Sequence, residues 1–184
     1  MRGIISAIIP VSEISGSAPC FVPLCFPLKR IPPAKRVGYN HPMADFNYYH
    51  PIEVRYGDLD PQGHVNNARY LTYFEQARIS YIAHLGLWTS GSFIDIGIIL
   101  ADAHLNFRKA VIFGQPVRVG VRVAHLGTKS LRMEYSLLDS ADGTELVNGS
   151  TVLVTYDYRT GSTIPIPESW RSTIAVFENL PAPA

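Results

Sequence analysis

One stretch of the chain, between Asn67 and Leu85, repeats its apolar residues with the period of a helix. It contains no proline or glycine, and its apolar or aromatic residues follow at steps of four, three, four and four: Tyr70, Phe74, Ala77, Tyr81 and Leu85. Such steps place side chains on one helical face. Further apolar positions widen this face: Leu71, Tyr73, Ile79 and Ile82. The pattern predicts a long central helix that is covered on more than one side.

The segments on either side of this helix have the character of strands. Residues 54–56 look like the end of a first strand, and later β-like segments cover residues 95–110, 117–126, 130–139 and 145–158. Within 117–126, valine occupies every second position as far as Val123, which is typical of a half-buried strand. The sequence therefore predicts a strand, the long helix and then four strands in antiparallel succession. This is an α+β arrangement in which the sheet curls around the helix.

A polar loop precedes the helix. Gly57, Pro61 and Gly63 interrupt any regular element there, so Asp60 lies on a turn. Asn66 and Asn67 are natural N-cap residues, because a short side-chain oxygen accepts a hydrogen bond from an unpaired amide of the first helical turn. Gly86 follows the helix at a position where a left-handed residue commonly ends one.

The first 45 residues differ in composition from the rest. They carry seven of the fourteen prolines and both cysteines, Cys20 and Cys25, so we expect a proline-rich N-terminal tail over residues 1–45. The domain itself is expected over 46–170, followed by a C-terminal tail over 171–184. Residues 1–9 resemble a weak secretory signal, but Pro10 and Glu13 interrupt it. A start at Met43 would omit this tail.

Charge and cysteine usage exclude several classes of function. Residues 1–45 hold five Lys/Arg against two Asp/Glu, which leaves eleven against thirteen in the remainder, so nothing supports nucleic-acid binding by the domain. No apolar run approaches the roughly 18 residues that span a bilayer. The two cysteines have no further cysteine partner, and we expect no metal site. The expected location is the cytoplasm.

The stretch DLDPQGHVNNARYLTYFEQAR (58–78) resembles the signature of hotdog-fold acyl-CoA thioesterases, the 4-hydroxybenzoyl-CoA thioesterase-like family. The resemblance runs from about Ile52 to Pro167 and includes the later segments FRKAVIFGQPVRV and GTKS. It implies a five-stranded antiparallel sheet wrapped around one long central helix. It also implies an acyl-CoA substrate, no cofactor beyond the CoA of that substrate, and a homodimer with the active site at the seam, often paired further into a homotetramer.

The residues of this stretch suit thioester hydrolysis. The reaction needs a nucleophile or base near the carbonyl carbon and a donor for the oxygen that becomes negative. The resemblance assigns the first role to Asp60, as nucleophile or as general base for water. It assigns the oxyanion donor to the amide of Asn67, at a helix start where unpaired amides and the positive end of the dipole converge. Asp58, by contrast, is expected to be structural, as a turn former.

Other residues are candidates with equally plausible structural roles. His64 would position water, the carboxylate or the acyl group, or else simply pack near the helix start. Tyr56 and Tyr70 would line the acyl pocket, although aromatic residues more often belong to the core. The candidates for CoA phosphate binding are the residues Arg108, Lys109, Lys129 and Ser130. Exposed basic residues at strand ends are usually only solvated.

Two alternatives to a thioesterase stay open. The fold also hosts enoyl-CoA hydratases and dehydratases, whose signature resembles an Asp with a His five positions later, whereas Asp60 and His64 are four positions apart. The second alternative is a non-catalytic acyl-CoA-binding module. The sequence contains no G-x-S-x-G, P-loop or G-x-G-x-x-G motif. It does not indicate which acyl group is bound.

Overall fold

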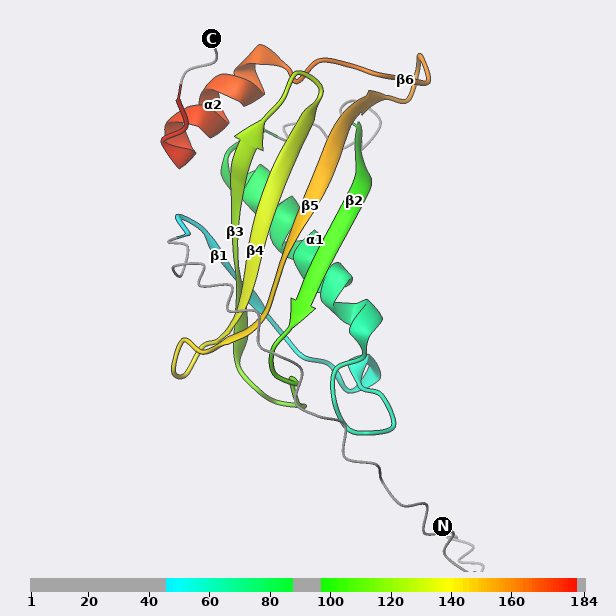
Figure 1. Cartoon of the computed structure of the whole chain (residues 1–184), viewed down its shortest axis with the longest axis vertical. Helices are drawn as coiled ribbons and strands as arrows, with labels where there is room; N and C mark the ends of the chain where they lie inside the picture. Colours follow the sequence, from blue (N-terminus) through cyan, green and yellow to red (C-terminus); the bar gives the residue numbers. More distant parts are fainter. Residues whose placement is uncertain (1–45, 88–96, 182–184) are drawn as a thin grey trace, which may run out of the picture. The chain divides into compact units, whose positions relative to one another are not determined.

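The computed structural model describes residues 46–87 and 97–181. These residues belong to one compact unit, which runs from Pro42 to Ala184. The strands are β1 (Tyr49–Ile52), β2 (Gly97–Phe107), β3 (Val117–Leu126), β4 (Ser130–Asp139), β5 (Glu145–Asp157) and β6 (Ser162–Thr163). The helices are the 3-10 turn η1 (Tyr56–Asp58), α1 (Asn67–His84) and α2 (Glu168–Glu178) (Figure 1).

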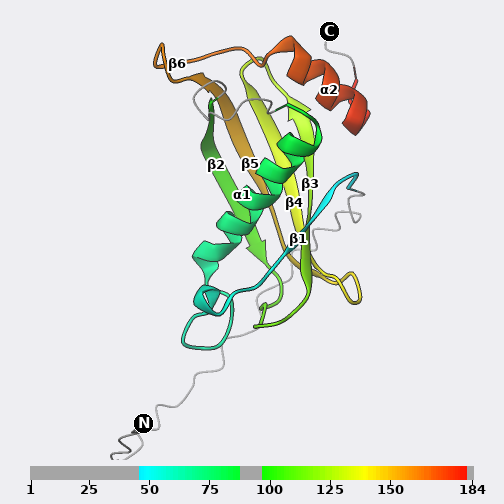
Figure 2. The same cartoon turned by 180° about the vertical axis from the view of Figure 1, so that it is seen from behind.

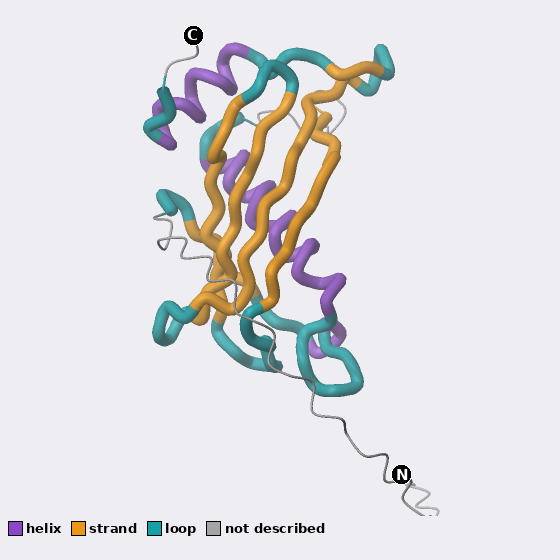
Figure 3. The backbone as a smooth tube through the Cα atoms, in the orientation of Figure 1, coloured by secondary structure: helices purple, strands orange, loops and turns teal. Residues whose placement is uncertain are grey.

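The strands form one antiparallel sheet in the order β1-β3-β4-β5-β2, and the short β6 pairs with β5 (Figure 3). The five longer strands and α1 confirm the predicted hotdog fold. The order of the strands corrects the predicted succession, because β2 pairs with β5 at the far edge and not with β3. The segment 108–116 returns the chain from that edge to β3. At about 3.3 Å per residue it is long enough to cross the roughly 14 Å between them.

Helix α1 lies across one face of the sheet (Figure 2). Its ends agree with the sequence pattern, since the Asn66 side chain caps the first turn and Gly86 follows with φ of 67°. Phe74 stacks on Tyr135 of β4 with ring centroids 4.6 Å apart. The helix is covered less completely than predicted, because Leu71 keeps 38% of its surface exposed. Within one chain the sheet therefore covers only part of the apolar surface of α1.

The first strand ends earlier than the sequence pattern indicates. Residues 54–56, predicted as a strand end, lie beyond β1, and Tyr56 begins η1. The reason is local: the Asp58 carboxylate accepts a hydrogen bond from the Arg55 amide at 3.0 Å, and the Asp58 amide donates to the Arg55 carbonyl at 3.0 Å. These two hydrogen bonds hold the backbone at Arg55 in a tight turn.

The later strands match their predicted ranges closely. Residues 117–126 and 130–139 are β3 and β4, and 145–157 form β5. The segment predicted over 95–110 is β2 from Gly97 to Phe107, while residues 95 and 96 lie outside the described part, as do the expected tail 1–45 and both cysteines. Residues 171–178, expected within a C-terminal tail, continue α2, which buries Trp170 and Ile174.

Candidate active site

The loop between η1 and α1 holds Asp60 by several hydrogen bonds. Its Oδ1 accepts from the amides of Gln62 at 2.9 Å and His64 at 3.2 Å, and its own amide donates to the His64 carbonyl at 2.8 Å. Gly63, with φ of 80°, supplies the left-handed residue that closes this turn. Within the described part of the chain, Oδ2 of the half-buried carboxylate accepts no hydrogen bond. One oxygen of Asp60 is thus anchored and the other is available.

The first turn of α1 begins directly after this loop. The Asn66 side chain accepts from the Ala68 amide at 3.0 Å, and the backbone of Asn66 is held by its amide, which donates to the Asp58 carbonyl at 2.8 Å. The amide of Asn67 has no hydrogen-bond partner among the described residues. An unpaired amide at the positive end of a helix is a donor suited to a negative oxygen.

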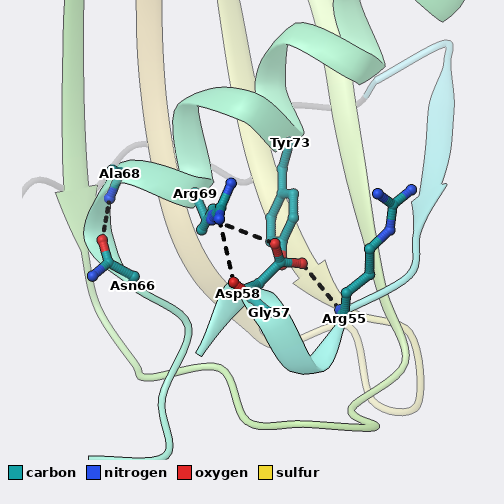
Figure 4. Close-up of polar contacts among 7 residues, drawn as sticks. All are labelled: Arg55, Gly57, Asp58, Asn66, Ala68, Arg69 and Tyr73. Carbon is teal, nitrogen blue, oxygen red and sulfur yellow. Dashed lines mark hydrogen bonds and ion pairs between the residues drawn. The ribbon is translucent and has the colours of Figure 1, made fainter. Parts of the chain in front are cut away.

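Asp58 has a different environment from Asp60, although the two are separated only by Leu59. Only 9% of Asp58 is exposed, and its Oδ2 accepts from the Tyr73 hydroxyl at 2.9 Å and from the Arg55 amide. Its Oδ1 lies 3.5 Å from Nε of Arg69 (Figure 4). Burial, together with this carboxylate, raises the pKa of Tyr73, which therefore stays protonated as a donor. Asp58 fastens the loop to α1, in agreement with its expected structural role.

The structure brings Tyr70 to the site but leaves Tyr56 in solvent. Tyr70 is 3% exposed, and its ring meets that of Phe107, at the end of β2, with centroids 5.2 Å apart. Burial raises the pKa of Tyr70, and the charge of Asp60 adds to this rise. Tyr56 is 81% exposed and its ring contacts Phe113. Its side chain is therefore mostly exposed to solvent in the single chain.

His64 is positioned mainly through its backbone. It forms an isolated β-bridge with Ile112, and the neighbouring Val65 amide donates to the Val111 carbonyl at 2.8 Å. These contacts fasten the Asp60 loop to the segment after β2. The His64 side chain is exposed at the surface of the loop.

The basic candidates divide between the two ends of the sheet. Arg108 and Lys109 follow β2 at the end where Phe107 meets Tyr70, although Nε of Arg108 is already paired with Oε1 of Glu145 at 2.6 Å. Lys129 and Ser130 lie at the β3–β4 connection, at the opposite end (Figure 1). In the sheet register, Phe107 aligns with Val147 and Leu137, seven residues or about 23 Å along β4 from Ser130.

Lys129 also has partners of its own. Its Nζ donates to the carbonyl and hydroxyl oxygens of Thr163 at 3.0 and 3.2 Å.

Of the candidate residues, one chain brings together Asp60, Asn67, Tyr70 and the backbone around Arg108. It does not bring Lys129 or Ser130 to them.

The sequence interpretation missed a cavity of about 180 Å³ between α1 and the strands β2 and β5. Its lining includes Leu71, Thr72, Phe74, Glu75, Arg78, Ile98, Leu100 and Thr151. Arg78 is only 8% exposed. The available signal was its spacing, since Arg78 lies four residues after Phe74 and places a charge beside the apolar face of the helix.

Two structural findings concern the metal site and the membrane span that were considered from the sequence. Within residues 46–87 and 97–181, no group of three or more His, Cys, Asp or Glu side chains is arranged to hold a metal ion. None of the helices in this part is both long and apolar enough to cross a membrane.

Comparison with known proteins identifies the family. The model of the thioesterase-like superfamily matches residues 54–174, which include the Asp60 loop, α1 and the sheet from β2 to β5. The chain belongs to this superfamily. A thioesterase from Thermus thermophilus, solved in complex with coenzyme A and zinc, is 34% identical with a TM-score of 0.65, over 74% of this chain and 98% of that one.

Two relatives of known sequence extend this comparison. The long-chain acyl-CoA thioesterase FadM of Escherichia coli K12 is 25% identical over 67% of this chain and 93% of its own length. The uncharacterized protein YsmA of Bacillus subtilis 168 is 24% identical over 71% of this chain and 87% of its own length. Both matches cover most of the relative, so the similarity concerns whole domains.

Proposed function

We propose that this member of the superfamily is an acyl-CoA thioesterase, which hydrolyses an acyl-CoA thioester to the free acid and CoA with Asp60 as its catalytic carboxylate. The observation that carries the proposal is the arrangement of Asp60, with one oxygen anchored by two amides and the other available, beside a helix start whose first amide is unpaired. The CoA complex of the Thermus relative supports acyl-CoA as the substrate class.

The proposed reaction assigns one role to each group. Either the available oxygen of Asp60 attacks the thioester carbonyl carbon, or it takes a proton from a water molecule that attacks. In both cases the carbonyl oxygen becomes negative and accepts from the amide of Asn67. The C–S bond then breaks, and CoA leaves as a thiolate that takes up a proton. In the nucleophilic variant, water hydrolyses the acyl-aspartyl anhydride and restores the carboxylate.

The rigid surroundings of the donor make it effective. The Asn66 cap and the bond from the Asn66 amide to Asp58 fix the helix start before substrate arrives. A donor that is fixed in advance does not have to reorganise as the charge develops, and losing one commonly costs about a hundredfold or more in rate. His64 has a positioning role at the rim of the site, and Tyr70 lies beneath it.

The experiment that tests this function measures thiol release from a panel of aromatic, short and long acyl-CoAs. Asp60→Asn keeps Oδ1 as an acceptor for the two loop amides but removes the charge, so kcat should fall by about a hundredfold to ten-thousandfold while acyl-CoA binding survives. His64→Ala should cost less. Carrying out a single turnover in ¹⁸O water distinguishes the two roles, because only a nucleophilic Asp60 acquires the label.

Two outcomes would contradict the proposal. One is the absence of thiol release from every acyl-CoA tested, and the other is release by Asp60→Asn at the wild-type rate. Addition of water to an enoyl-CoA without thiol release would instead indicate a hydratase. Binding of acyl-CoA without any product would indicate a binding module.

The assembly that we propose is a homodimer formed at the β2 edge. β2 pairs with β5 on one side, and no strand of the described residues pairs with its other side. Several apolar side chains of this edge are exposed, with Ile99 at 37%, Leu100 at 43% and Phe107 at 52%. A long unpaired edge is a template for another strand, and a second copy of β2 would fit it symmetrically.

Antiparallel pairing of the two copies can set polar side chains opposite each other. If the pairing centres on Ala103, Asp102 lies opposite His104 of the partner subunit, and the reciprocal pair forms at the same time. Because Phe107 packs on Tyr70, this edge adjoins the candidate site. The CoA groove would then be shared between the subunits.

A further inference from the structure

The cavity beside α1 lies on the same helical face as the proposed oxyanion donor. Asn67, Leu71, Glu75 and Arg78 follow at steps of four, four and three, which place them along one side of the helix. Three of these four line the cavity, and Asn67 begins the row. The row therefore runs from the first residue of α1 to Arg78 at the cavity.

Arg78 is a buried cation with incomplete neutralisation. Its Nη2 atom is 3.5 Å from Oε1 of Glu75, but the Glu75 side chain is 62% exposed, so water competes for this carboxylate. On the sheet side the guanidinium adjoins the Tyr135 hydroxyl, which forms a 2.9 Å hydrogen bond with Thr151. Both neighbours on that side are neutral. A buried charge is costly without a close partner of opposite sign, and such a site favours a bound anion.

The cavity is partly open to solvent in the single chain, and its dimensions indicate the size of anion that it suits. A volume of about 180 Å³ slightly exceeds the roughly 150 Å³ of an engineered cavity that binds benzene. Asn67 and Arg78 are eleven residues apart, or about 16 Å along the axis, and helical side chains lean toward the N-terminus. The gap to be bridged is then on the order of 10 Å, which suits an acyl chain of about five or six carbons with a hydrogen bond at each end.

We propose that this cavity holds the far end of the acyl group and that Arg78 binds a carboxylate there, so that the preferred substrates are short acyl-CoAs whose acyl group ends in a carboxylate. This inference rests on the proposed thioesterase function and specifies its substrate class. Leu71 and Leu100, which are 38% and 43% exposed, contact the methylene groups, while Phe74 and Thr151 are buried in the wall of the cavity. Arg78 is a specificity residue in this scheme and takes no part in breaking the thioester bond.

The test compares matched substrates and corrects for spontaneous hydrolysis. The wild-type kcat/KM for glutaryl-CoA and adipyl-CoA should exceed that for hexanoyl-CoA and heptanoyl-CoA by about tenfold or more, as expected for a charge-assisted contact. Arg78→Gln should abolish this preference, so that the ratio of kcat/KM for glutaryl-CoA to that for hexanoyl-CoA falls by about tenfold or more. Arg78→Lys should retain part of it. The matched control is Arg122→Gln, since Arg122 pairs with Glu134 at 2.7 Å and does not line the cavity.

A second variant tests the charge without removing Arg78. Leu71→Glu adds a carboxylate to the cavity wall at a position that is 38% exposed and compatible with a helix. It should lower turnover of glutaryl-CoA more than that of hexanoyl-CoA. A wild-type preference for methyl-ended chains, or an unchanged preference in both Arg78→Gln and Leu71→Glu, would overturn this inference and leave the thioesterase function standing. Hydrolysis of no acyl-CoA at all would refute both.

Discussion

Asp58 and Asp60 show how two identical side chains in one loop acquire different roles. Asp58 is enclosed by Arg55, Arg69 and Tyr73, and both of its oxygens are engaged. Asp60 has one oxygen bound to loop amides and the other available. The difference follows from which carboxylate faces α1. It separates the residues that hold the loop from the residue proposed to act on the substrate.

This contrast predicts opposite effects of the same substitution. Asp58→Asn replaces an acceptor of the Tyr73 hydroxyl or the Arg55 amide with a donor and removes the charge beside Arg69, so it should lower the free energy of unfolding by about 1 to 3 kcal/mol. Urea denaturation measures this loss. Turnover per folded molecule should fall far less than in Asp60→Asn, whose stability should stay near that of the wild type. A stable but inactive Asp58→Asn protein would contradict the assignment.

The residue-scale features of the site were accessible from sequence only where they depend on neighbours in the chain. The turn at Asp60 and the Asn66 cap follow from local residue types. Arg78 could not be placed in a cavity beforehand, because its surroundings come from β2 and β5, which are distant from it along the chain. Lys129 was grouped with Arg108 for its charge alone, and sequence does not reveal which end of a sheet a strand occupies.

At the scale of elements, the packing of α1 on the sheet depends on Gly149 of β5. A Cβ at this position would lie 2.5 Å from the His104 carbonyl oxygen and 3.0 Å from the Phe74 ring. The first contact involves backbone and cannot be relieved by a rotamer change. The helix and the β2 backbone therefore approach β5 closely only because this residue has no side chain.

Gly149→Ala is accordingly expected to destabilise the domain. Overpacking of this kind typically costs about 1 to 3 kcal/mol, which thermal or urea unfolding would detect. Gly57→Ala is the matched control, since its added Cβ would meet nothing within 4 Å. Equal stability of the two variants would show that α1 and β2 can move away from β5 without cost.

The helix α2 is joined to α1 by a hydrogen bond to a carboxyl group that can titrate. The Tyr81 hydroxyl donates to Oε1 of Glu178 at 2.6 Å, and the Val123 amide donates to the same oxygen at 3.3 Å. Burial raises the pKa of Glu178, against the opposing effects of these donors and of Arg122. The folded chain therefore binds the Glu178 proton more tightly than the unfolded chain does.

The sign of the resulting effect can be tested by unfolding between about pH 4 and pH 7. Stability from the bound proton is fully present below the ordinary pKa of 4.5 and is lost as the pH rises through the raised value. Glu178→Gln keeps an oxygen acceptor for Tyr81 but cannot ionise. Its stability relative to the wild type should therefore increase from pH 4 to pH 7. A difference that does not change with pH would contradict the raised pKa.

The strand order shows the limit of sequence reasoning for the whole molecule. Strand ranges and the hotdog class were predicted, because alternation and turn residues are local signals. The position of β2 at the sheet edge depends on pairing with β5, far later in the chain, which no local pattern encodes. α2 was missed because its apolar face is short and begins after Pro167, with Trp170 and Ile174 as its buried residues.

The free edge of β2 leads to a prediction about assembly. Lysine at both Asp102 and His104 would set like charges opposite each other in a symmetric β2–β2 pair, so this double variant should shift a dimer toward monomer. Light scattering coupled to size exclusion measures the change. Thiol release should fall together with the dimer fraction on dilution, because Phe107 joins this edge to Tyr70 at the site.

Val176→Lys provides the control, because Val176 is 80% exposed on α2, an element that does not form the β2 edge. It should leave the mass and the activity unchanged. A wild-type monomer that retains full activity on dilution would refute the shared groove. A dimer that survives the double lysine variant would show that the second copy binds elsewhere.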